Sequence, residues 1–262
     1  MIEHVNRRDF IRSTAALGTL ALIPTLLSCQ SETDSAHNIF STLVHLNDKR
    51  LPEWLKRQDL RLTSNSMGAM NDNHNVPSPG LTAAFIRDAI CALVSPESFY
   101  YKSAKLQMSL HYATNYLLQA QHADGTIDLP TTNFHSPPDT GFVLEWVCGA
   151  CQVLKDHGYD ELNSTRQLLE SFILNAAAAL AEGGIHTPNH RWVVCMALAR
   201  AYSLFPKQAF LNRIDRWLQE HIDIDPDGQF TEKSSAIYSP LTDRCLITMA
   251  RLLETPELYE PV

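Results

Sequence analysis

The sequence has 262 residues, 45% of them hydrophobic, and a formal net charge of −8 at pH 7. Non-specific nucleic-acid binders need clustered Lys and Arg to displace counterions, so this acidic chain predicts no nucleic-acid partner. The charge does not exclude an acidic small ligand, because a few arginines inside one cleft suffice to bind it.

The N-terminal segment has the features of an export signal. The pair Arg7-Arg8 precedes an apolar run that ends at Leu27 and is too short for a stable membrane anchor. The Arg-Arg-Asp-Phe-Ile context resembles a twin-arginine signal, and the Leu-Leu-Ser-Cys stretch that follows resembles a bacterial lipobox. A buried N-terminal helix is the alternative interpretation.

The lipobox resemblance has consequences for the mature protein. We expect residues 1–28 to be removed as a signal peptide and Cys29 to carry the lipid that anchors the chain in a membrane. Residues 29–40 are then expected to form a tether. The predicted location is the periplasm or the cell surface of a bacterium. About 230 residues remain, enough for one domain with a sizeable core.

Five cysteines follow Cys29, and all of them lie in apolar helical runs. Their odd number argues against a disulfide framework and favours packing in the core. Cys148 and Cys151 have the spacing of a redox or metal motif, but no second pair or flanking histidine accompanies them. We therefore expect core packing there, and neither a metal nor a cofactor in the protein.

The chain after the tether predicts an alternation of two kinds of helix. Long amphipathic helices are expected at 97–121, 160–184 and 206–222, and shorter, more apolar ones at 87–94, 141–158, 192–205 and 243–254. The apolar helices recur about every 50 residues, which indicates stacked helical hairpins. We expect the apolar helices to form an inner ring and the amphipathic helices an outer ring.

Polar loops precede three of the apolar helices, at 131–141, 186–192 and 231–244. Since each loop leads into an inner helix from the same end, we expect the three loops to converge on one face of the ring. That face is the predicted functional face.

These stretches together resemble a known group of enzymes. The turn DGTID at 124–128, TPNHRW at 187–192 and DGQFTEKSSAIYSPLTDR at 227–244 are similar to (α/α) toroid enzymes that act on polysaccharides. The nearest are uronic-acid lyases of the alginate-lyase and heparinase II/III-like kind, with related glycoside hydrolases. The resemblance spans about residues 80 to 254 and implies an all-α toroid over residues 41–262. The chain has fewer hairpins than a closed ring needs, so the expected toroid is incomplete or truncated.

Cleavage of a uronate by β-elimination needs a group that neutralises the carboxylate, a base and an acid. Asn189 is the candidate neutraliser, assisted by His190 or Arg191, although Asn189 is also a plausible helix N-cap. The resemblance places a catalytic tyrosine in the loop that contains Tyr238, which is the candidate base or acid. His135 is the alternative base and a possible uronate ligand.

Three further residues are candidates for substrate binding. Trp192 is placed to stack on a sugar ring or to pack in the core, and His186 lies in the same polar loop. Arg244 is a possible ligand for an acidic sugar, or a structural partner of Asp243 at a helix start.

Three carboxylates support a rival chemistry. Asp139, Glu145 and Glu232 are candidate acid, base or binding groups of a glycoside hydrolase. Asp139 is also placed as an N-cap, and Glu232 as a partner for Lys233 or Arg244. Glu145 lies inside an apolar helix, so we expect it to have a partner or a raised pKa.

The hypothesis from sequence is an exported, lipid-anchored enzyme that cleaves uronic-acid-containing polysaccharide or oligosaccharide by β-elimination. A glycoside hydrolase on the same scaffold is the first alternative. A truncated, non-catalytic glycan-binding fragment is the second.

Overall fold

The computed structural model of the chain describes residues 28–184 and 187–262, with side chains described from residue 38. Most of the predicted signal peptide therefore lies outside the described residues. The chain divides into two units between Thr42 and Leu43, and the second unit, Leu43–Val262, is compact. The predicted tether, residues 29–40, is helical and belongs to the first part of helix α2 (Ser28–Arg57).

The second unit is built almost entirely from helices, which confirms the all-α prediction. After α2 the helices are α3 (Pro79–Val94), α4 (Ala104–Gln119), α5 (Pro137–His157), α6 (Asn163–Glu182), α7 (Pro188–Leu204), α8 (Gln208–Gln219) and α9 (Tyr238–Leu252). Two 3₁₀ helices are η1 (Asp160–Leu162) and η2 (Pro256–Tyr259). Two short antiparallel hairpins are formed by β1 (Met70–Asn71) with β2 (Pro77–Ser78) and by β3 (Ile127–Leu129) with β4 (Asn133–Ser136).

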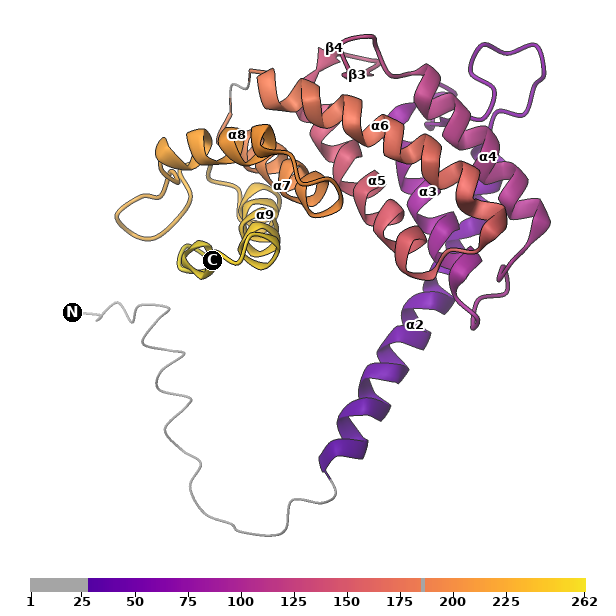
Figure 1. The fold of residues 1–262 in the computed structure, drawn as a ribbon, viewed down its shortest axis with the longest axis horizontal. Helices are drawn as coiled ribbons and strands as arrows, with labels where there is room; N and C mark the ends of the chain where they lie inside the picture. The colour runs from indigo at the N-terminus through magenta and orange to yellow at the C-terminus, as the bar shows by residue number, and fades with distance from the viewer. Residues whose placement is uncertain (1–27, 185–186) are drawn as a thin grey trace. The chain divides into compact units, whose positions relative to one another are not determined.

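The helices form two layers, as the alternation of apolar and amphipathic segments predicts (Figure 1). In the inner layer α3 packs on α5, α5 on α7 and α7 on α9. In the outer layer α4 packs on α6 and α6 on α8, and each outer helix also packs on the inner helix that precedes it. The inner α7 buries residues all around its axis, whereas the outer α8 buries only Phe210 and Ile214.

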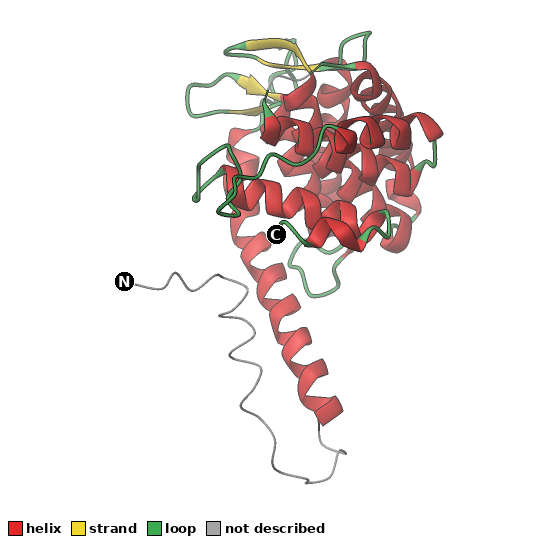
Figure 2. Ribbon diagram, turned by 90° about the vertical axis from the view of Figure 1, so that its left-hand side faces the viewer, coloured by secondary structure: helices red, strands yellow, loops and turns green. Residues whose placement is uncertain are grey.

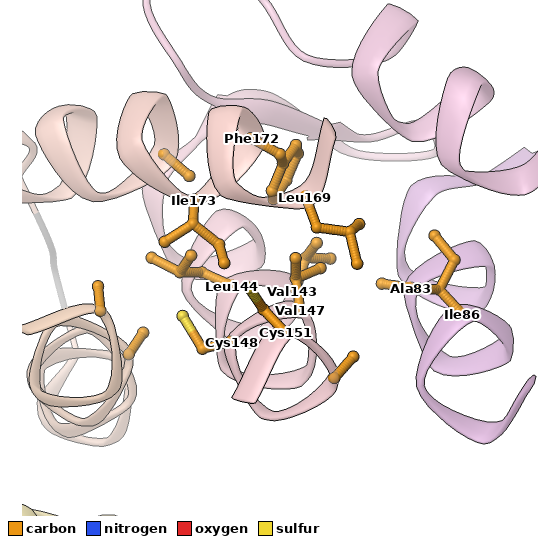
Figure 3. Close-up of a cluster of buried hydrophobic side chains, with 14 of the residues drawn as sticks. Ala83, Ile86, Val143, Leu144, Val147, Cys148, Cys151, Leu169, Phe172 and Ile173 are labelled. Carbon is orange, nitrogen blue, oxygen red and sulfur yellow. The ribbon is translucent and has the colours of Figure 1, made fainter. Parts of the chain in front are cut away.

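The cysteines are part of the core between these layers, as expected. Cys148, Cys151, Cys195 and Cys245 are buried free thiols, and Cys91 is half-buried. Figure 3 shows Cys148 and Cys151 on α5 beneath Phe172 and Ile173 of α6. Burial raises the pKa of the Cys151 and Cys245 thiols to about 12, so both stay protonated and act as apolar side chains.

Both hairpins lie at the same end of the helical layers and lead into an inner helix (Figure 2). The inner helices α3 and α5 begin in the same way. Ser78 and Ser136 are their N-caps, and each side chain accepts a hydrogen bond from a backbone N–H of the first turn. Four residues after each cap, Thr82 and Thr140 accept a hydrogen bond from the backbone N–H that starts the hairpin.

A second junction repeats between the same hairpins and the outer helices. The Gln58 side chain donates to the carbonyls of Gly68 and of Ser109 on α4, at 3.3 and 2.8 Å. The Gln121 side chain donates in the same way to Gly125 and to Phe172 on α6, at 3.0 and 3.1 Å. The helical repeat predicted from the apolar pattern therefore extends to individual hydrogen bonds.

Candidate functional site

The centre of the candidate site is His190 in the first turn of α7. Its ring lies edge-on to Phe142 of α5, with ring centroids 6.2 Å apart. Burial lowers the pKa of His190 from its usual 6.5, and the nearby carboxylates of Asp139 and Glu232 oppose that shift. The imidazole is consequently neutral at pH 7 and able to accept a proton.

Glu232 reaches this site from the loop before α9. Its carboxylate accepts a hydrogen bond from the backbone N–H of Asn189 at 2.8 Å. The N-cap of α7 is Thr187, whose side chain makes no capping hydrogen bond, so Glu232 caps this helix from another part of the chain. The interpretation of Asn189 as the N-cap is therefore wrong, and so is the pairing of Glu232 with Lys233, which binds Asp225 instead.

The Asn189 side chain is only 3% exposed. Its amide oxygen accepts a hydrogen bond from the Thr187 hydroxyl at 3.0 Å. That contact fixes which side of the amide carries the oxygen and which side carries the two N–H donors. The geometry therefore holds Asn189 beside His190 in a fixed orientation.

Asp139 reaches the site from the first turn of α5. Ser136 is the N-cap, so the expectation that Asp139 caps the helix is wrong. The Ser136 hydroxyl also donates to the Asp139 carboxylate at 2.5 Å, which ties Asp139 to the capping residue. The structure thus brings together Asp139, Asn189, His190 and Glu232 at the N-terminal ends of α5 and α7.

Trp192 packs in the core, and Arg191 is engaged by two carboxylates of the chain itself. The buried Arg191 guanidinium pairs with Glu220 at 2.9 Å and with Asp223. It also lies over the Trp192 ring at 4.7 Å. Trp192 is 1% exposed, so it has no face on which a sugar can stack. The binding roles predicted for both residues are not supported by this geometry.

Two other candidates lie on other elements than His190, with His135 on β4 and Tyr238 at the start of α9. His135 pairs with Asp124 at 2.6 Å and stacks on His122, whose ring centroid is 3.8 Å away. His122 itself pairs with Asp128 at 2.7 Å, which gives a cluster of four polar side chains on the β3–β4 hairpin. Tyr238, the first residue of α9, is 40% exposed. His186 lies outside the described residues.

A second polar cluster lies on the inner helices. Glu145 of α5 is buried, and Arg244 of α9 donates to its carboxylate at 3.1 Å. Arg200 of α7 approaches the same carboxylate at 3.9 Å. Burial raises the pKa of Glu145, opposed by the charges of Arg244, Arg200 and Arg87. Both the partner and the raised pKa expected for this residue are confirmed, and the partner of Arg244 is Glu145.

This inner cluster contains residues that the sequence analysis missed. Arg87 of α3 lies over the ring of Trp146, 5.3 Å from its centroid, and Trp146 is half-buried next to Glu145. Asp139, Phe142 and Trp146 follow one another at three- and four-residue spacing, so they share one face of α5. That spacing is the signal that would have identified Trp146, in place of Trp192, as the half-buried tryptophan on the same face as Asp139.

No protein-family description, curated protein or solved structure matches the chain. Within residues 28–184 and 187–262, no group of three or more His, Cys, Asp or Glu side chains is arranged to hold a metal ion. In that same part of the chain, no helix is long and apolar enough to cross a bilayer.

Proposed function

We propose that this protein cleaves uronic-acid-containing polysaccharide by β-elimination. The observation that carries the proposal is the convergence of Arg87, Arg200 and Arg244, from three inner helices, around the single carboxylate of Glu145. An acidic chain that concentrates arginines on one inner surface favours an anionic ligand there.

Each carboxylate here is shared between arginines. Arg200 and Arg244 share Glu145, and Arg87 shares Asp88 with Arg50. The side chains of Arg87 and Arg200 are each 32% exposed and that of Arg244 is 47% exposed, so a ligand can reach them. A guanidinium pairs well with a carboxylate, and uronic acids supply one on every sugar.

Unsatisfied atoms in the cluster support the same proposal. Glu145 Oε2 and Arg200 Nε are buried and make no hydrogen bond among the described residues. Such atoms are few in native proteins and call for a partner such as water or a ligand. Trp146, beside Arg87, adds an aromatic surface on which a sugar ring can stack.

The proposed reaction uses residues at the N-terminal ends of α7 and α9. Asn189 donates to the uronate carboxylate, and neutral His190 takes the C5 proton. The electron pair left at C5 forms the C4–C5 double bond as the C4–O4 bond breaks. Tyr238 protonates the departing oxygen. We propose that these residues act on the scaffold of an (α/α) toroid, in a lipoprotein that is exported and anchored through Cys29.

A hydrolase is the second candidate, and one observation favours it. Asp139 and Glu232 both lie near enough to His190 to influence its pKa, so two carboxylates flank one site. Paired carboxylates are the machinery of glycoside hydrolysis. A glycan-binding fragment without catalysis is the remaining possibility.

Mass spectrometry of the products from a panel of uronic-acid glycans tests the proposal. Elimination gives fragments whose masses add up to that of the substrate, one of them with an unsaturated end. We expect His190→Asn to lower turnover about 10²-fold or more, and Tyr238→Phe to lower it as well. His157→Asn, at the exposed end of α5, is the matched control and should leave turnover unchanged. Products heavier by one water would replace the lyase with the hydrolase, and no products at all would support the binding fragment.

A further inference from the structure

A groove lies beside the outer helix α4, and its lining shares no residue with the His190 site or with the arginine cluster. It runs between the loop at 64–67 and helix α4 and encloses about 480 Å³. Its lining contains no Asp, Glu, Lys or Arg and consists of Ser64, Asn65, Met67, His111, Tyr112, Asn115 and Gln119.

The loop that forms one wall is an insertion relative to the next repeat. In the first junction Gln58 bonds to a glycine ten positions later, whereas Gln121 bonds to a glycine four positions later. The difference, 10 − 4, leaves six extra residues in the first repeat. The second repeat makes the same junction without them, so the extra residues are not needed to form this junction. Insertions into repeats commonly form binding surfaces.

The inserted loop is held in one conformation by Asp59. Its carboxylate, which is buried, accepts hydrogen bonds from the Arg61 guanidinium and from the hydroxyls of Ser64 and Ser66. The Arg61 hydrogen bond is the main cause that keeps the pKa of Asp59 well below its usual value. A loop fixed in this way presents a preorganised wall, which reduces the entropy lost when a ligand binds.

The lining defines the class of ligand. Asn65, Asn115 and Gln119 offer amides that both donate and accept, which suits hydroxyl groups. Tyr112 adds a phenol and, with Met67, an apolar surface for C–H faces. Neither a carboxylate nor a guanidinium is present to recognise a charged ligand. We propose that this groove binds a neutral oligosaccharide, as a site separate from the one that acts on acidic glycans.

Calorimetric titration of the full chain with neutral gluco-, manno- and galacto-configured oligosaccharides tests this proposal. At least one should bind saturably, and Asn115→Ala combined with Gln119→Ala should weaken that binding about tenfold or more. The control is Gln208→Ala combined with Asn212→Ala, which removes two amides at the same spacing from the outer helix α8. Thermal unfolding of both double variants verifies that they remain folded.

Three results would overturn the proposal: no neutral oligosaccharide binds, binding survives in the α4 double variant, or only an acidic oligosaccharide or a peptide occupies the groove. The proposal does not rest on the lyase activity. The α4 double variant should still cleave uronic-acid glycans. If the lyase proposal fails, the binding of neutral oligosaccharides in the groove should still be observed.

Discussion

Replacing glycine with alanine at the repeated junction tests whether the two hairpins are held to the outer helices as the structure indicates. Gly125 has a φ of +88°, and an added Cβ would lie 2.3 Å from the backbone oxygen of Asn175 on α6. Gly68 has a φ of +97°, and its Cβ would lie 2.0 Å from the backbone oxygen of Tyr112 on α4. Because both obstacles are helix backbone, neither can rotate away.

A third glycine separates the two sources of the expected cost. Gly228 has a φ of +83° but nothing within 4 Å of an added Cβ, so Gly228→Ala carries conformational strain alone, about 1–2 kcal/mol. Gly125→Ala must also push the hairpin off α6 and break both Gln121 hydrogen bonds, each contributing about 1 kcal/mol. We therefore expect Gly125→Ala to cost about 3–4 kcal/mol, and Gly68→Ala a similar amount.

Chemical denaturation followed by far-ultraviolet circular dichroism measures these free energies of unfolding. Gly149→Ala serves as a control of opposite sign, since Gly149 is inside α5 with open space around it and should gain about 0.5–1 kcal/mol. The reasoning is refuted if Gly125→Ala costs no more than Gly228→Ala, because the contact with α6 would then contribute nothing.

Three other predictions follow from ionisable groups. Arg244→Ala should lower the free energy of unfolding by about 1–2 kcal/mol, because it leaves the Glu145 carboxylate buried with a weaker partner. In a double-mutant cycle, adding Glu145→Gln should recover part of that loss. Additive effects of the two substitutions would contradict this pairing. Because the folded pKa of His190 is below its unfolded value of 6.5, the unfolded state binds more protons as pH falls, and this residue destabilises the fold at low pH. The free energy of unfolding of His190→Asn should accordingly fall less than that of the parent chain between about pH 8 and about pH 5. Equal losses would show that burial does not lower the pKa of this ring. Asp59→Asn should increase hydrogen exchange at the Gly68 amide, which closes the inserted loop by donating to the backbone carbonyl of Asp59. Unchanged protection of this amide would mean that the Asp59 carboxylate does not hold the loop.

The helices and their layers could be predicted because a buried helix face requires apolar residues at regular spacing in the sequence. Residues 192–205 are mostly apolar and become the inner α7, which is buried throughout residues 191–199. Residues 206–222 alternate between apolar and polar and include the outer α8, which buries only Phe210 and Ile214. The burial of Cys148 and Cys151 could be predicted in the same way, since they lie in an apolar run with no second metal-ligand pair near them in the sequence.

The candidate site was harder to predict because its contacts join distant segments. Glu232 caps α7 from 43 positions away, and Arg191 finds its carboxylates 29 and 32 positions along the chain. Local sequence gives no sign of such pairs, so the capping role predicted for Asn189 and the binding role predicted for Arg191 conflict with the partners that these residues have. Thr187 and Ser136 are hard to identify as caps from sequence because more polar residues follow the prolines next to them.

The Glu145–Arg244 pair has a consequence for how the protein unfolds. It joins α5 directly to α9 although α7 packs between them in the inner layer. Neighbouring helices lie about 8–10 Å apart. Side chains of the first and the third helix can therefore meet only if the three helices are arranged along a curve, with these side chains on its inner side. In a simple repeat array each unit senses only the next one, and the terminal unit can melt alone. Here the melting of α9 would also remove Arg244 from the buried carboxylate of Glu145 on α5, two helices away. The last hairpin and the middle of the array are therefore expected to unfold as one cooperative unit.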